Sequence, residues 1–351
     1  MINRRNRMKI GIDCRLINKV QNTGISRYTE FLIEYYINRF GSENIILISN
    51  DDCFEYKGCE ILYTKLRPFN ILHFLHFSSF VENLGIDLFH VPFYSAFFKK
   101  SPDIKIIVTV HDLMYRLVTD FFGTNKLLNN LKIKYFDFIV KKSLLNADKI
   151  VSISQTTKKD VFATYGFDSF HIPEDSEIGG EGDYAILERH NLQMKKFYFY
   201  CGNNRPHKNL NFIIKIFENN PNLPPLVLAG KGHHDFENVI TTGVVTEEEL
   251  KALYQSATAF VFPSKYEGFG LPVLESLRLG TSVIASKISA FLEFKTQNIF
   301  FFELENERDF LEAIDQALSH DFVHDKSFLD YYDKNKIYEL NDVMINDLLK
   351  K

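Results

Sequence analysis

Short apolar runs alternate with longer segments of helical periodicity along the first half of the chain. The runs are rich in Val, Ile, Leu and Phe, as is typical of strands buried on both faces. They span residues 9–16, 45–49, 88–91, 104–110 and 149–153. Apolar residues recur at helical spacing over residues 25–40, 70–84 and 126–145. Strands that alternate with helices in this way favour a parallel sheet with helices on both faces.

A second alternating series follows a change of character at residues 168–192, which are polar, Gly-rich and without periodicity. We interpret that stretch as a linker or long loop. The later strands are expected at 197–201, 225–229, around Val244, at 259–263 and at 282–285. The later helices are expected at 210–219, 247–256 and 272–279.

The two series predict an α/β protein with two Rossmann-like domains. We place the first at residues 1–175 and the second at 176–325. Residues 326–351 fit a terminal helix that packs back on the first domain. Ligands of open α/β sheets bind beyond the carboxyl ends of the strands, so both domains are expected to present loops to a cleft between them.

Length and composition agree with this division and restrict the class of protein. A chain of 351 residues suits two domains better than one compact core. It has no run of about 18 apolar residues, so no membrane-spanning helix is expected. Arg4, Arg5, Arg7 and Lys9 precede a strand-like run rather than the apolar region of a signal peptide, which favours a cytoplasmic location. The four cysteines form no CxxC pair and are expected to be reduced.

Charge is uneven along the chain. Residues 1–150 carry 21 Lys and Arg against 15 Asp and Glu, a net charge of +6, whereas the remainder carries 20 against 30, a net charge of −10. A basic first half suggests anionic lipid as a partner, although a merely solvated surface gives the same pattern. The aromatic, amphipathic stretch 69–81 supports peripheral contact with the inner face of the plasma membrane. No nucleic-acid partner is expected.

The segment 262–275 carries the strongest chemical signal. A predicted buried strand leads into a loop with Glu267, and Pro272 stands where a helix begins. A helix N-terminus offers unpaired N–H groups to a phosphate, and Gly268 and Gly270 allow close approach of the backbone to a ligand. Glu275 is expected in the first helical turn. The alternative is an ordinary strand–turn–helix connection whose acids are exposed and cap the helix.

A second segment, residues 200–210, places Arg205 and Lys208 in a loop between a strand and a helix. Two fixed positive charges at that position are suited to clamping a diphosphate. Surface Arg and Lys pairs are common, so the segment alone also fits a solvated loop.

Two segments of the first half are weaker candidates. Gly24 precedes a predicted helix, where an ordinary turn is the alternative to a ligand-binding loop. His111 and Asp112 follow a predicted strand, and a lone histidine there is usually a structural one. Asp112 either orients His111 by a hydrogen bond or caps the following segment.

Residues 266–275, in which seven residues separate the two glutamates, resemble the signature of the retaining glycosyltransferases of family 4. These enzymes have the GT-B fold, two Rossmann-like domains that face a cleft. The resemblance implies that Glu267 contacts the donor sugar near the reacting carbon and that Glu275 bonds the nucleotide ribose. It also assigns donor binding to the turn made of Gly268, Phe269, Gly270 and Leu271.

The other segments resemble further parts of the same family. Lys208 and Arg205 correspond to the pair that neutralises the leaving diphosphate, although the family arginine often stands directly after the glycine, where this chain has Asn203. The loop of Gly24 resembles the one that approaches donor phosphate and acceptor. His111 is expected to contact the transferred sugar.

The resemblance implies a metal-independent, retaining hexosyltransferase. The donor is expected to be a GDP- or UDP-sugar, and the acceptor a saccharide or lipid-linked saccharide of bacterial surface polysaccharide, such as O-antigen, with a mannosyl-type enzyme favoured. The chain contains no Asp-x-Asp motif, so neither a metal nor another cofactor is expected. Two alternatives remain open: a sugar-nucleotide epimerase or hydrolase of the same fold, and a non-catalytic sugar-nucleotide-binding protein.

Overall fold

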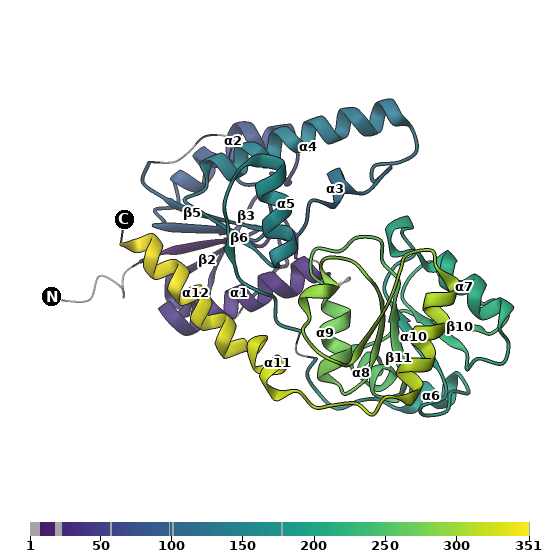
Figure 1. Ribbon diagram of the computed structural model, residues 1–351. Helices are drawn as coiled ribbons and strands as arrows, with labels where there is room; N and C mark the ends of the chain where they lie inside the picture. Colours follow the sequence, from purple (N-terminus) through teal and green to yellow (C-terminus); the bar gives the residue numbers. More distant parts are fainter. Residues whose placement is uncertain are drawn as a thin grey trace. The chain divides into compact units, whose positions relative to one another are not determined.

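The computed structural model describes residues 8–17, 23–56, 58–97, 99, 102–176 and 178–350. It divides into two compact units, the first formed by Met1–Asp175 with Lys334–Lys351 and the second by Ser176–Asp333. Each unit is built around one parallel sheet covered by helices (Figure 1). The basic residues Arg4, Arg5 and Arg7 lie outside the described residues.

The first unit has a seven-stranded sheet in the order β3-β2-β1-β4-β5-β6-β7, with every pairing parallel. Its strands are β1 (Ile10–Asp13), β2 (Ile45–Ser49), β3 (Glu60–Tyr63), β4 (Leu88–Val91), β5 (Lys105–Val110), β6 (Lys149–Ser152) and β7 (Phe170–His171). Its helices are α1 (Gly24–Phe40), α2 (Ile71–Glu82), α3 (Met114–Leu117), α4 (Lys126–Asn146), α5 (Gln155–Tyr165) and α12 (Lys334–Leu349).

Helices cover both faces of this sheet. On one face, Phe77 of α2, Val140 of α4 and Val161 of α5 belong to a single apolar cluster with strand residues of β4 and β5. On the other face lies α1, whose Tyr28 hydroxyl is 3.0 Å from the Thr109 hydroxyl of β5. Helix α12 packs on α1, and Tyr35 donates a hydrogen bond of 2.6 Å to Asp342.

The second unit has a six-stranded sheet in the order β10-β9-β8-β11-β12-β13, again with every pairing parallel. Its strands are β8 (Tyr198–Cys201), β9 (Leu226–Ala229), β10 (Val239–Gly243), β11 (Ala259–Phe262), β12 (Val283–Ser286) and β13 (Ile299–Phe302). Its helices are α6 (Ala185–Arg189), α7 (Leu210–Asn219), α8 (Glu247–Ser256), α9 (Leu271–Arg278), α10 (Glu307–Ser319) and α11 (Lys326–Tyr331).

The structure contains β3, β13 and α10, which the sequence prediction lacks, and it differs from two of the predicted assignments. Residues 168–192 are not all loop, because they contain β7 and α6, which are too short to give a period. Val244 is not in a strand: β10 ends at Gly243, and the Val244 side chain is 67% exposed. As an edge strand of mixed Val, Ile and Thr residues, β10 lacks the continuous apolar run that marked the central strands.

A buried ion pair closes the carboxyl end of β1. Arg15 Nη2 lies 2.5 Å from Asp13 Oδ2, and both side chains are inaccessible to solvent. The guanidinium also donates a 2.6 Å hydrogen bond to the Leu66 carbonyl and lies 3.7 Å from the centre of the Phe77 ring. A buried charge without its partner is costly, so each ion of this pair depends on the other.

We therefore expect Asp13→Asn to lower the free energy of unfolding by about 3–5 kcal/mol, because it leaves the Arg15 guanidinium buried without a counter-charge. Urea unfolding monitored by circular dichroism measures the change. The matched control is Glu339→Gln, which breaks the exposed Lys336–Glu339 pair and should cost less than about 1 kcal/mol. Equal effects of the two variants would contradict the prediction.

Candidate functional site

Parallel pairing of β8 with β11 brings two of the predicted segments together in the second unit. Tyr198 and Phe199 of β8 lie in register with Ala259 and Phe260 of β11. Because the strands are parallel, the loops that follow them leave the same edge of the sheet. One loop carries Lys208 and the other carries Glu267.

Lys208 and Glu267 form an ion pair at this edge. The Lys208 ammonium donates a hydrogen bond of 2.6 Å to Glu267 Oε1, although 59 residues separate the two along the chain. Their side chains are only 14% and 12% exposed. The ammonium also lies 4.8 Å from the centre of the Phe262 ring, and Lys265 N–H donates to the His207 carbonyl at 2.7 Å, so the two loops are joined.

The turn between Glu267 and α9 is fixed by tight packing. Gly270 has φ +113°, and a Cβ there would lie 2.8 Å from Phe291 Cε1. The neighbouring Phe269 side chain is buried, with its ring 5.4 Å from that of Phe294. The turn therefore holds its backbone in one conformation. Donor contact by the backbone of Gly268, Phe269, Gly270 and Leu271 stays a prediction.

Glu275 is buried as well, at 3% exposure. Helix α9 begins at Leu271, so Glu275 lies in the second helical turn rather than the first as expected. One of its carboxylate oxygens accepts a hydrogen bond of 2.8 Å from the Tyr254 hydroxyl of α8, which lies 2.9 Å from Cys201 Sγ at the end of β8. The alternative in which both acids are exposed is therefore wrong.

Burial, reinforced by Cys201 and Glu275, raises the pKa of Tyr254 well above its ordinary value. The phenol therefore keeps its proton and remains a hydrogen-bond donor at neutral pH. This donor holds the Glu275 carboxylate beside the end of β8. Sequence patterns gave no sign of Tyr254, because its position in α8 reads as an ordinary core residue.

Arg205 does not join the cluster. It is exposed, and its backbone N–H is bonded to Asn203 Oδ1 at 3.2 Å. Two buried donors nearby in the sequence, Asn209 Nδ2 and Ser264 Oγ, have no hydrogen-bond partner in the described structure. Unsatisfied buried donors are uncommon, and an acceptor-rich ligand at this edge would satisfy them.

The loop after β9 also reaches this edge of the sheet. A Cβ on Gly230 would lie 2.0 Å from the Gly202 carbonyl oxygen, so only glycine fits there. The His233 Nε2 atom lies 2.8 Å from the same carbonyl. His233 thus contacts the backbone that follows β8.

In the first unit, two further predicted segments meet. Gly24 begins α1, and the Thr23 side chain caps the helix by accepting a hydrogen bond of 3.2 Å from Ser26 N–H. One turn later, the Tyr28 ring packs edge-on against the His111 ring, with centroids 4.9 Å apart. The loop of Gly24 and the end of β5 are therefore neighbours.

Both ring nitrogens of His111 have acceptors. Nε2 donates to the Pro92 carbonyl at 2.9 Å, and Nδ1 lies 2.8 Å from Glu174 Oε1. Burial alone would lower the pKa of His111, but the hydrogen bond and charge of Glu174, together with the Pro92 carbonyl and the charge of Asp112, raise it. An imidazolium cation suits this pair of acceptors. The predicted contact of His111 with a sugar stays a prediction.

Glu174 is a residue that sequence reasoning missed, since it lies in the aperiodic stretch after β7. It fills the orienting role considered for Asp112. Asp112 Oδ1 accepts a hydrogen bond of 2.8 Å from Met114 N–H at the start of α3.

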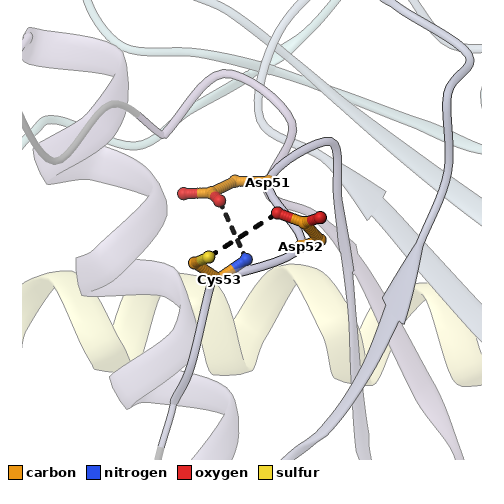
Figure 2. Close-up of side chains that lie close together, drawn as sticks. All are labelled: Asp51, Asp52 and Cys53. Atoms are coloured by element: carbon orange, nitrogen blue, oxygen red, sulfur yellow. Dashed lines mark hydrogen bonds between the residues drawn. The ribbon is translucent and has the colours of Figure 1, made fainter.

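Among the described residues, one group of side chains is close enough to hold a metal ion: Asp51, Asp52 and Cys53 (Figure 2). All three are exposed. Asp51 accepts a hydrogen bond of 2.9 Å from Cys53 N–H, and the Cys53 thiol lies 3.6 Å from Asp52 Oδ1. These bonds describe an exposed turn after β2, a common arrangement of acidic residues.

Two family models match most of the chain. Residues 24–173 match the model described as Glycosyltransferase Family 4, and residues 185–335 match the model described as Glycosyl transferases group 1. The first match lies within the first unit, and nearly all of the second lies within the second unit.

Curated relatives share about a quarter of their residues with the chain. O-antigen chain mannosyltransferase RfbU of Salmonella typhimurium is 28% identical over 222 residues, which are 59% of this chain and 59% of that protein. The chain therefore spans about three-fifths of this relative. O-antigen biosynthesis glycosyltransferase WclY of Escherichia coli is 26% identical over 322 residues, which are 82% of this chain and 83% of that protein.

Solved structures share the fold at lower identity. Anabaena Alr3699/HepE in complex with UDP-glucose has a TM-score of 0.70 at 13% identity, covering 97% of this chain and 100% of that one. Sucrose-phosphate synthase from Thermosynechococcus elongatus has a TM-score of 0.69 at 16% identity, covering 96% of this chain and 94% of that one. With its two parallel α/β units, the chain has the predicted GT-B fold class.

The His111–Glu174 contact predicts a pH dependence of stability. A raised His111 pKa adds stability that is fully present below the unfolded histidine pKa of about 6.5 and is lost as pH rises through the folded pKa. In Glu174→Gln, burial dominates the His111 pKa, which should therefore fall below its value in the unfolded chain. The variant should then no longer lose stability as pH rises through the range in which the wild type does.

NMR titration of the His111 ring measures the pKa directly, and urea unfolding between pH 5 and pH 8 measures its linkage to stability. His324→Gln, on the exposed segment before α11, is the control and should leave the His111 titration unchanged. An unchanged His111 pKa in Glu174→Gln would show that the carboxylate is not its cause.

Proposed function

The chain belongs to the group 1, family 4 glycosyltransferases, and we propose that it transfers a hexosyl group from a nucleotide-diphosphate sugar to a saccharide acceptor with retention of anomeric configuration. The observation that carries this proposal is the Lys208–Glu267 ion pair at the joint edge of β8 and β11. It places a cation suited to a diphosphate beside a carboxylate suited to a sugar.

The ion pair suggests how the donor binds. A diphosphate offers more negative charge than one carboxylate, so its oxygens compete for the Lys208 ammonium. Glu267 then exchanges its bond with Lys208 for hydroxyl donors of the sugar. Asn209 Nδ2 and Ser264 Oγ are buried donors that oxygen atoms of the ligand would satisfy.

The chemical step breaks the bond between the anomeric carbon and the diphosphate oxygen. The acceptor hydroxyl forms the new bond on the same face, and its proton passes to the departing phosphate oxygen. Charge grows on the diphosphate as the bond breaks, and Lys208 is already positioned to stabilise it. The N-terminus of α9 adds partial positive charge, so we propose that the reaction requires no metal.

For Glu275 and His111 we propose binding roles. Tyr254 holds the Glu275 carboxylate beside the end of β8, where it can accept from ribose hydroxyls. His111, held between the Pro92 carbonyl and Glu174 at the carboxyl edge of the first sheet, is proposed to contact the transferred sugar. Gly24, at the N-terminus of α1, is proposed to approach the donor phosphate. Arg205 is exposed and, with Lys208, is proposed to bind the diphosphate.

The relatives suggest the pathway class. The names of RfbU and WclY assign them to O-antigen synthesis, so we propose that this chain elongates a saccharide or lipid-linked saccharide of a bacterial surface polysaccharide. A mannosyl donor is favoured because RfbU is named a mannosyltransferase. A lipid-linked acceptor would bring the enzyme to the inner face of the plasma membrane.

Lys208→Ala and Glu267→Ala should each lower the transfer rate by at least about 100-fold, because each removes a charged group that faces the reacting diphosphate or sugar. The assay uses a radiolabelled nucleotide sugar and a lipid-pyrophosphate saccharide. Lys265→Ala, which removes a half-exposed cation of the same loop, is the control and should retain activity. Wild-type activity in Lys208→Ala or Glu267→Ala would refute the role of that residue.

A donor panel separates the proposal from its alternatives. GDP-mannose, UDP-hexoses and UDP-N-acetylhexosamines are first compared by thermal shift, and the donor that stabilises the wild type is then assayed with and without acceptor. Transfer only in the presence of acceptor supports the proposal. Product without acceptor would identify an epimerase or hydrolase, and binding without any product would identify a non-catalytic protein.

A further inference from the structure

A chain of hydrogen bonds in the second unit runs from the end of β8 to the carboxylate of Glu275. Cys201 Sγ lies 2.9 Å from the Tyr254 hydroxyl, and that hydroxyl donates a bond of 2.8 Å to Glu275 Oε2. We call these three residues the Cys201–Tyr254–Glu275 relay. Successive members are 53 and 21 residues apart along the chain and belong to β8, α8 and α9, so tertiary packing brings them together.

The protons of the relay point in one direction. The phenol of Tyr254 has a single proton, which the Glu275 carboxylate accepts. The Cys201 thiol therefore donates its own proton to the phenol oxygen. Each bond holds the next group in place, and the relay ends on the carboxylate.

The Tyr254 ring is held independently of its hydroxyl. The ring is fully buried, with its centroid 5.1 Å from that of Phe199 in β8 and 5.1 Å from that of Phe260 in β11. The Tyr254 carbonyl accepts a hydrogen bond of 2.7 Å from the Thr281 hydroxyl. A phenylalanine at this position keeps all of these contacts, so the hydroxyl can be removed without a change in packing.

The relay fixes the direction in which Glu275 presents its carboxylate. A glutamate side chain has several rotatable bonds, and ordering it around a ligand costs free energy. The Tyr254 hydroxyl orders this side chain before any ligand binds. Because Glu275 is only 3% exposed, water is a poor substitute for a ligand hydroxyl that is missing.

We propose that the relay makes Glu275 select ribonucleotide donors over deoxyribonucleotide donors, with Tyr254 and Cys201 as positioning residues. A carboxylate repels a diphosphate but accepts bonds from the neighbouring hydroxyls of a ribose. A buried group that is built to bond a hydroxyl rejects the analogue that lacks it, because the group is then left unpaired. Guanosine and uridine diphosphate sugars carry both ribose hydroxyls, whereas deoxythymidine diphosphate sugars lack the 2′-hydroxyl. The inference rests on the proposed function, in which Glu275 accepts from the ribose.

Nucleotide binding to the full chain, measured by isothermal titration calorimetry, tests the proposal without an acceptor. The probes are GDP and UDP, and the one that binds more tightly is compared with its 2′-deoxy and 3′-deoxy forms. In the wild type, loss of at least one of these hydroxyls should weaken binding by about tenfold or more, because the buried Glu275 carboxylate then lacks a donor.

Tyr254→Phe should weaken binding of the ribonucleotide by about tenfold, but it should change binding of the discriminated deoxy form by less than about threefold. A hydroxyl with a merely structural role would affect both nucleotides equally. Cys201→Ala should act in the same direction by a smaller factor. Cys201→Ser keeps a donor to the phenol oxygen and should bind as the wild type does.

Transfer kinetics give a second readout. The ribose is remote from the bond that breaks, so Tyr254→Phe should raise the KM for the sugar nucleotide and leave kcat within about twofold of the wild type. The matched control is Tyr198→Phe, at a fully buried tyrosine of β8 whose hydroxyl has no hydrogen-bond partner in the described structure. This variant should bind both nucleotides as the wild type does. Thermal melting checks that each variant is folded, and Cys201→Ala replaces Tyr254→Phe in the comparison if the latter does not fold.

Equal weakening of both nucleotides in Tyr254→Phe, or a preference for the ribonucleotide that Tyr254→Phe and Cys201→Ala both leave intact, would overturn the relay and leave the proposed transfer activity standing. So would a wild type that binds the ribonucleotide and both deoxy forms equally. A preference that depends on Tyr254, in a wild type without transfer activity, would support the relay and refute the proposed function. A wild type that binds no nucleotide would overturn both.

Discussion

Parallel strand pairing is the constraint on which the candidate site depends. A parallel sheet sends all its carboxyl ends to one edge, so loops that are distant in sequence become neighbours there. In the second unit this brings Lys208 within hydrogen-bond distance of Glu267 across 59 residues of chain. In the first unit it brings His111, after β5, against the Pro92 carbonyl, after β4. Neither contact involves residues of one local motif.

The charged side chains at these sheet edges are paired with one another and largely buried. Asp13 with Arg15 and Lys208 with Glu267 each join a cation to a carboxylate with little exposure, and the buried His111 ring lies against the Glu174 carboxylate. Removing one partner of such a pair is costly because the other charge stays buried. The pairs therefore favour one arrangement of the loops. Near the Lys208–Glu267 pair, the buried donors Asn209 Nδ2 and Ser264 Oγ have no hydrogen-bond partner in the described structure.

The inner strands of both sheets could be predicted because they are buried on both faces and therefore continuous in apolar residues, whereas the edge strands β3, β7 and β13 were not predicted. Edge strand β10 broke that rule, and Val244 was misplaced beside it. The grouping of Lys208, Glu267 and Glu275 near one sheet edge followed from the resemblance to the family and from the rule that ligands of open α/β sheets bind beyond the carboxyl ends of the strands. The Tyr254–Glu275 and His111–Glu174 contacts did not, since each joins elements whose proximity is set by tertiary packing. Periodicity predicted the helix α4. It could not predict which leucines of α4 are exposed, because tertiary packing decides that.

Helix α12 has a consequence for how the protein is made. It completes the first unit, yet the whole second unit stands between it and β7 in the chain. The ribosome therefore synthesises residues 176–333 before it synthesises α12, the helix that packs on α1. Until then the Phe31 and Tyr35 rings of α1, each within 5.2 Å of the Tyr338 ring in the finished fold, lack their cover. Packing of α12 on α1 joins parts of the chain about 300 residues apart.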